Sequence, residues 1–212
     1  MGTMWWRVKE LEVWCVIGPL QRAARYESVE PLVRLTKACT RRGAYAAYAT
    51  VLLGACARTR YAELALAFVL SRRLNEGLKK WANQPRPYVE FPGQVSYFKK
   101  RKMSFSFPSQ SVQTLAIAYC AFHDYPVDVP LTYYGSIVRS IGSCYVAALI
   151  FLVAIVRIYR GLHYPHDVIV SLLIARTLVT IVAFLLTKIN NSNHLAALLV
   201  GCFSTEKDRG GV

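Results

Sequence analysis

The stretch "RIYRGLHYPHD", residues 157–167, lies between two long apolar runs and decides the fold. The runs on either side, 137–156 and 168–186, each have roughly the 20 residues that a helix needs to cross the hydrocarbon core of a bilayer. The stretch between them is polar and contains Gly and Pro, which interrupt helices. We therefore predict two membrane-spanning helices that meet at a short polar turn on one face of the membrane.

The composition of the whole chain extends this prediction. Of its 212 residues, 54% are hydrophobic and only 18% are charged, which is typical of a membrane-embedded protein. Because lipid offers no hydrogen-bond partners to the backbone, we expect the spans to be α-helical. The predicted fold class is all-α, an integral membrane helical bundle of five or six spans with an amphipathic N-terminal segment. The other apolar runs are 44–57, 61–78, 112–122 and a short one at 194–203.

The N-terminal segment differs from the spans. It pairs Trp5, Trp6 and Trp14 with charged residues, a pattern typical of a helix that lies at the membrane interface. We expect this helix to end near Gly18-Pro19. The predicted organisation is an amphipathic N-terminal segment, 1–42, a transmembrane domain, 43–190, and a short apolar piece with the C-terminal tail, 191–212.

The charge of the chain indicates its partners. The formal net charge is +14, and the basic residues flank apolar runs, where they meet anionic headgroups or an anionic substrate. The predicted partners are therefore the lipid bilayer and a membrane lipid substrate, and no nucleic acid. The six cysteines are scattered, with no Cys-x-x-Cys pair and no Cys/His cluster, so we predict no metal site.

Three polar stretches should converge on one face of the membrane, because even numbers of crossings separate them. They are "KKWANQPRP", 79–87, "PSQS", 108–111, and the stretch 157–167. The cations Lys79, Arg86 and Arg157 suffice to neutralise a phosphoryl group. An arginine guanidinium can also bind two phosphate oxygens at once. Ser109 precedes an apolar run, so it and the first N–H groups of that helix form a candidate anion site.

The reactive group at this predicted site is a histidine. His163 is a candidate nucleophile, and Asp167, four residues on, can hold its other ring nitrogen. These residues predict phosphoryl transfer through a phosphohistidine, without a metal or cofactor, because the cations stabilise the charge. Taken singly, each piece has a simpler reading: an anchoring Arg, a satisfied His–Asp hydrogen bond, a helix cap. Their joint occurrence in this order favours a catalytic site.

Two spaced motifs resemble those of the type 2 phosphatidic acid phosphatase family, which includes membrane lipid phosphatases and soluble vanadium haloperoxidases. They are Lys79-x6-Arg86-Pro87 and Arg157-x5-His163-x3-Asp167. The resemblance covers about residues 60–187 and implies a phosphatase whose nucleophile is His163. The stretch "NEGLKKWANQPRP", 75–87, also resembles the dolichyl diphosphatase branch, which implies the endoplasmic reticulum membrane.

The middle motif departs from the family pattern Pro-Ser-Gly-His. Pro108 and Ser109 match it, but Gln110 and Ser111 replace Gly and His. In the family that His protonates the leaving group, and a serine hydroxyl is too weak an acid to do so. The loss of this acid favours a diphosphate substrate, because the leaving group of a diphosphate is a phosphate monoester, which is stable as an anion without a proton. His166 is a candidate substitute acid, although a cap of the following span is the simpler role.

The function expected from the sequence is that of a membrane lipid phosphatase that hydrolyses a polyprenyl or dolichyl diphosphate. One alternative is a catalytically impaired relative that keeps the phosphate site and binds a lipid phosphate or a protein partner. A further alternative is a lipid phosphate monoesterase that acts on phosphatidic acid. The retained set of His163, Asp167 and three cations favours an active enzyme over the impaired relative.

Overall fold

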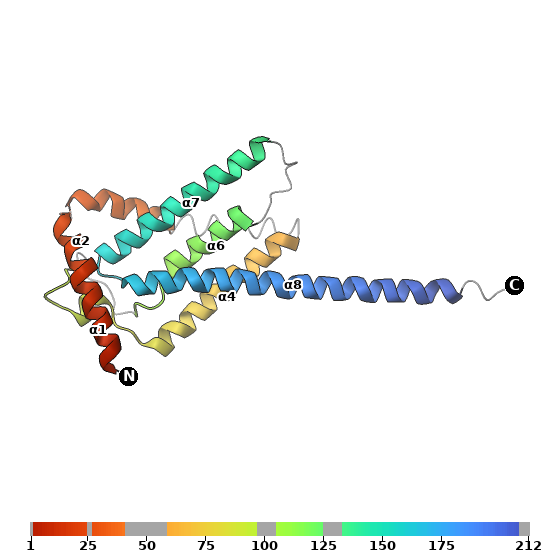
Figure 1. Ribbon diagram of the computed structural model, residues 1–212, viewed down its shortest axis with the longest axis horizontal. Helices are drawn as coiled ribbons and strands as arrows, with labels where there is room; N and C mark the ends of the chain where they lie inside the picture. Colours follow the sequence, from red (N-terminus) through yellow and green to blue (C-terminus); the bar gives the residue numbers. More distant parts are fainter. Residues whose placement is uncertain (1, 25–26, 41–58, 97–104, 125–132, 208–212) are drawn as a thin grey trace.

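The computed structural model describes residues 2–24, 27–40, 59–96, 105–124 and 133–207, and these residues form helices and connecting turns without a strand (Figure 1). Residues 27–40 are helical as well. The other helices are α1 (Gly2–Glu12), the π-helical turn η1 (Val13–Ile17), α2 (Gly18–Ala23), α4 (Thr59–Ala82), α5 (Pro87–Glu90), α6 (Gln110–Asp124), α7 (Tyr133–Tyr159) and α8 (Pro165–Lys207).

Helix α6 is the centre of the bundle and packs against α4, α7 and α8, while α4 also packs against α8. Its buried residues Val112, Ala116 and Cys120 recur every four positions and form one stripe along the helix. Small residues such as Ala175 on α8 let the helices approach closely. The shared core lies between α4, α6 and α8 and comprises Leu64, Ala67, Phe68, Ala116, Ile117, Cys120, Ala175, Val179 and Val182.

The outward faces of α7 and α8 are apolar. Tyr145 and Phe151 on α7 and Leu173 on α8 are all more than 60% exposed, which suits contact with lipid. Within the described part of the chain, two segments are long and apolar enough to cross a membrane, Ser140–Tyr159 and Pro165–Lys188. They overlap the two runs predicted on either side of the polar turn, 137–156 and 168–186. The expected span at 44–57 lies outside the described residues.

Two helix ends differ from the sequence prediction. The N-terminal helix does not end at Gly18-Pro19 but continues to Ala23. Pro19 lies in the first turn of α2, where a helix tolerates a residue without a backbone N–H. In the π-helical turn before it, Gly18 N–H bonds to Val13 O, five residues back, so the helix continues through this point. The apolar piece 194–203 is the end of α8, because no Gly or Pro interrupts residues 166–200.

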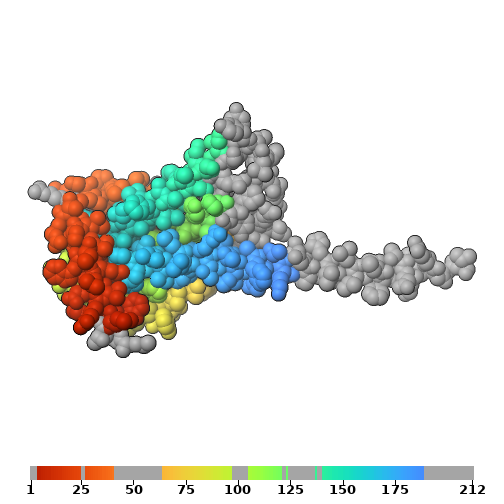
Figure 2. Space-filling model, in the orientation of Figure 1, coloured from red at the N-terminus to blue at the C-terminus, as the bar shows by residue number. Residues whose placement is uncertain are grey.

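The N-terminal helix lies across one end of the bundle, next to the start of α8 (Figure 2). Its inward residues Val13 and Ile17 are buried in a small core with Phe91, Val95 and Tyr164. Its outward face exposes the apolar and aromatic side chains of Met4, Trp5, Trp6, Val8, Leu11 and Trp14. The charged side chains of Lys9, Glu10 and Glu12 on the same helix are half-buried, so the apolar side chains of this segment are the ones available to a membrane interface.

Candidate active site

The three polar stretches meet at the end of the bundle that α1 covers. They lie at the C-terminal ends of α4 and α7 and at the N-terminal ends of α6 and α8 (Figure 1). Contacts between the stretches show how near they are, because Arg86 donates to the carbonyl of Leu162 and Arg157 donates to the hydroxyl of Ser111. The structure therefore brings together the groups that the sequence placed on one face of the membrane.

The position of the first stretch is determined by how α4 ends. Asn83 adopts a left-handed conformation, with φ at 44°, which Asn tolerates better than most residues. The chain then turns so that Arg86, only 7% exposed, donates from Nη1 to the carbonyl of Leu162 at 3.2 Å. Burial, reinforced by Arg86 and Arg157 and opposed by Asp167, lowers the pKa of Lys79 to about 8.

The second stretch forms the N-terminus of α6. Ser109 precedes the helix, and its carbonyl accepts the first helical bond, from Gln113 N–H at 3.0 Å. Its own N–H donates to Ser171 Oγ at 2.7 Å, and the Ser171 hydroxyl donates to the Asp167 carbonyl. The Ser109 hydroxyl is fully buried and has no protein partner within the described residues. A buried hydroxyl is costly unless something bonds to it, so it suits a phosphate oxygen.

The third stretch carries the His–Asp pair. Gly161 turns the chain with φ at +61°, and a Cβ there would lie 2.5 Å from Val95 Cγ1, so only glycine fits. His163, 4% exposed, points Nδ1 at Asp167 Oδ2 at 3.6 Å. That oxygen also accepts the Tyr164 N–H at 3.0 Å. With Nδ1 facing the carboxylate, Nε2 is the ring nitrogen left to react.

The environment of His163 keeps its imidazole neutral. Burial lowers the pKa of His163 to about 4; Arg86 and Arg157 act in the same direction, and Asp167 opposes them. Neutral imidazole has a free lone pair, whereas imidazolium has none. At neutral pH His163 therefore has the protonation state that a nucleophile needs.

Ser111 lies inside the site. Its hydroxyl accepts a hydrogen bond from Arg157 Nη2 at 2.7 Å. The position that carries an acid in the family pattern is thus a hydroxyl held by a guanidinium, and no side chain that titrates near neutrality replaces the acid there.

His166, the candidate substitute acid, lies in the first turn of α8. Its Nδ1 is 2.7 Å from Glu12 Oε2 and its Nε2 is 3.2 Å from Asp167 Oδ1. Gln84 Nε2 lies 3.0 Å from the same Nε2 and also donates to Asp167 Oδ1 at 3.3 Å. Because both ring nitrogens face carboxylates, the geometry favours a supporting role at the start of α8 over proton donation to a leaving group.

Sequence reasoning did not single out three residues that contact the site, Gln84, Ser171 and Glu12. Gln84 stands inside the quoted motif "NQPRP" and could have been found there. Ser171 follows Asp167 by one helical turn, a weaker signal. Glu12 lies 154 residues from His166, and nothing in the sequence connects the two. The described residues include no group of three or more His, Cys, Asp or Glu that could hold a metal ion.

Comparisons with known proteins find a matching family and a similar fold. The profile of the PAP2 superfamily matches residues 60–191. One similar solved structure is a transmembrane PAP2 type phosphatidylglycerolphosphate phosphatase from Bacillus subtilis, with 21% identity, a TM-score of 0.60, and coverage of 84% of this chain and 87% of that one. Another is LpxE of Aquifex aeolicus, with 19% identity, a TM-score of 0.57, and coverage of 79% and 92%. No curated protein sequence matches the chain.

Proposed function

The chain belongs to the PAP2 superfamily, and we propose on that premise that it hydrolyses a polyprenyl diphosphate through a phosphohistidine intermediate. Lipid phosphatases of this family are phosphoric-ester hydrolases, so the reaction class follows from membership. The finer choice of a diphosphate rests on Ser111, which stands where the family pattern has an acid and which contacts Arg157. The choice of the dolichyl type rests on the motif resemblance at residues 75–87. The motif resemblance also leads us to propose the endoplasmic reticulum membrane as its location.

The first step is capture of the terminal phosphate. Lys79, Arg86 and Arg157 supply positive charge, while the Ser109 hydroxyl and the N-terminus of α6 supply hydrogen-bond donors. These groups are held by the ends of helices, so they need little rearrangement when charge develops in the transition state. Phosphoryl transfer needs mainly such positioning and charge stabilisation.

The second step is attack by His163 Nε2 on the terminal phosphorus. The N–P bond forms as the P–O bond to the bridging oxygen breaks, and the electron pair leaves with the polyprenyl phosphate. Asp167 stabilises the positive charge that develops on the imidazole. Water then attacks the phosphohistidine, the N–P bond breaks, and inorganic phosphate leaves while His163 returns to its neutral form.

The leaving group decides which substrate this site can process. A phosphate monoester such as phosphatidic acid must expel an alkoxide, which needs a proton donor. A diphosphate expels a phosphate monoester that is stable as an anion. The Ser111–Arg157 pair offers a hydroxyl and a cation to such an anion, and it offers no acid.

The test is phosphate release by the full chain purified in detergent, with a polyprenyl diphosphate and phosphatidic acid assayed in parallel. We expect faster release from the diphosphate. Faster release from phosphatidic acid would instead support the monoesterase alternative, which is closer to the activity for which the Bacillus subtilis phosphatase is named. Release from neither substrate by a folded protein would support the impaired relative that only binds a lipid phosphate or a protein partner.

The pKa of Lys79 predicts a basic limb in the pH profile of kcat/KM. With a pKa of about 8, Lys79 loses its charge as the pH rises through that value, and kcat/KM should then fall by about tenfold per pH unit. Replacing Lys79 with arginine, which stays charged, should remove this limb. A limb that persists near pH 8 in Lys79→Arg would show that another group titrates there.

A further inference from the structure

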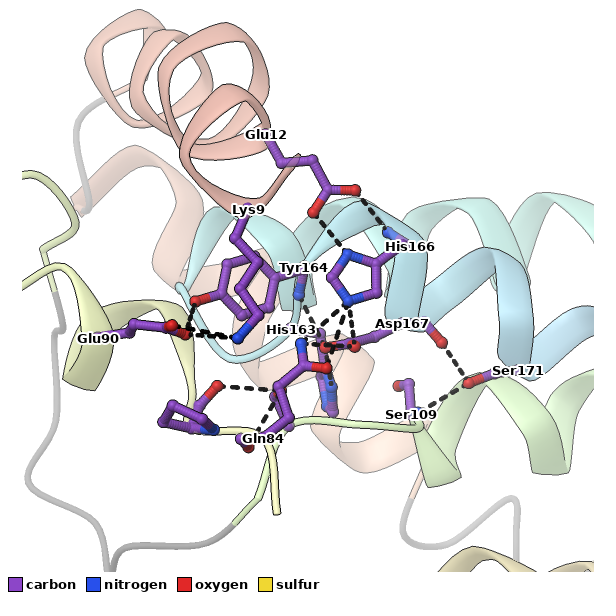
Figure 3. Close-up of polar contacts among 12 residues, drawn as sticks. Lys9, Glu12, Gln84, Glu90, Ser109, His163, Tyr164, His166, Asp167 and Ser171 are labelled. Carbon is purple, nitrogen blue, oxygen red and sulfur yellow. Dashed lines mark hydrogen bonds and ion pairs between the residues drawn. The ribbon is translucent and has the colours of Figure 1, made fainter. Parts of the chain in front are cut away.

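The N-terminal helix reaches the active site through Glu12 (Figure 3). Glu12 Oε1 accepts the backbone N–H of His166 at 3.0 Å, and Glu12 Oε2 lies 2.7 Å from the ring nitrogen Nδ1. The first N–H groups of a helix have no partner within it, so Glu12 caps α8 from outside. The same carboxylate holds the His166 ring, and the two side chains are only 16% and 15% exposed.

The His166 ring, which Glu12 holds in place, in turn contacts the carboxylate of Asp167. Its Nε2 lies 3.2 Å from Asp167 Oδ1, and Gln84 Nε2 donates to the same oxygen at 3.3 Å. The ring therefore has the Glu12 carboxylate at Nδ1, and at Nε2 it has the Asp167 carboxylate and the Gln84 amide, whose Nε2 lies 3.0 Å away. With Oδ1 held in this way, Oδ2 is the oxygen that faces His163. The resulting chain of contacts runs from Glu12 through His166 and Asp167 to His163.

A second set of contacts fixes α1 close to Glu12. Lys9 Nζ lies 3.1 Å from both carboxylate oxygens of Glu90, and the Tyr164 hydroxyl donates to Glu90 at 2.7 Å. Val13, the next residue after Glu12, is 1% exposed and packs in the small core beneath the helix. Because contacts hold the helix on both sides of Glu12, the carboxylate has little freedom to leave His166.

We propose that Glu12 is a positioning residue of the active site, which acts through His166 to hold the Asp167 carboxylate that orients His163. The family match begins at residue 60, so this contribution comes from a segment outside the matched region. A catalytic imidazole depends on the tautomer and orientation that its carboxylate imposes. The effect on turnover rests on the proposed phosphatase function, whereas the contact between Glu12 and His166 does not.

The kinetic test is Glu12→Gln in the full chain, which preserves the size of the side chain and removes its charge. With a polyprenyl diphosphate we expect kcat to fall about tenfold and KM to stay within about twofold. Glu10→Gln makes the same change on the same helix, and we expect wild-type kinetics for it. Thermal unfolding of both variants in detergent separates an effect on the site from a loss of fold. Unchanged kcat in Glu12→Gln overturns the proposal.

A second readout needs no turnover. Diethyl pyrocarbonate acylates a free imidazole nitrogen, and peptide mass spectrometry can follow each histidine separately. In the wild type we expect slower labelling at His166 than at His123, which is exposed at the far end of α6. In Glu12→Gln the rate at His166 should rise relative to His123, and an unchanged rate overturns the proposal. If no substrate is hydrolysed, the proposed function fails, while the labelling still decides whether Glu12 holds His166.

Discussion

Replacing His163 with alanine is expected to abolish phosphate release, with kcat lower by roughly 10⁴–10⁶-fold, as when a nucleophile is removed from other enzymes that form a covalent intermediate. The cations and the Ser109 hydroxyl remain, so the variant should still bind the lipid phosphate. What it loses is the atom that forms the N–P bond. The measurement is phosphate release from a polyprenyl diphosphate under saturating conditions, with binding measured separately.

Two further observations make this result specific. His123→Ala removes a histidine from the opposite end of α6 and should leave kcat unchanged. Acid-labile phosphate on the His163 peptide, trapped by rapid quenching, should appear in the wild type and be absent from His163→Ala. A His163→Ala enzyme that keeps more than a tenth of wild-type kcat would contradict the phosphohistidine mechanism.

The sequence predicted the parts of the site that depend on local spacing. His163 and Asp167 are four residues apart, so a turn followed by the first turn of a helix brings them together wherever the helix packs. Lys79 and Arg86 lie beside the end of α4, and Ser109 lies at the start of α6. Each of these positions follows from where an apolar run begins or ends, and that is readable from one sequence.

The contacts made by the N-terminal helix were not predictable in this way. The sequence indicated an amphipathic helix, but amphipathicity shows only which face is buried and leaves open what covers it. That Glu12 meets His166, and that Lys9 meets Glu90, depends on how the helix is laid across the end of the bundle. The contact that holds His166 at the start of α8 was not predictable for the same reason, because motif spacing does not connect His166 with its partner Glu12.

The second large effect concerns Ser111. If the missing acid restricts the enzyme to good leaving groups, then Ser111→His should raise the hydrolysis of phosphatidic acid by about 10²-fold, which is the lower end of the gain from general acid catalysis. Ser111 is half-buried in the first turn of α6 and contacts Arg157, so an imidazole at this position would stand beside the leaving oxygen. Hydrolysis of the diphosphate should change far less, because its leaving group needs no proton.

The control for Ser111→His is Ser111→Asn, which adds a polar side chain of intermediate size without a group that titrates near neutrality. Asparagine should bring no gain on phosphatidic acid, and the gain from histidine should disappear at a pH at which the imidazole is unprotonated. Folding is checked by thermal unfolding of each variant in detergent. If Ser111→His is folded, still cleaves the diphosphate and yet gains nothing on phosphatidic acid, then the substrate preference has another cause. The Ser111–Arg157 contact would in that case act on the bound phosphate, and the leaving group would not decide the substrate.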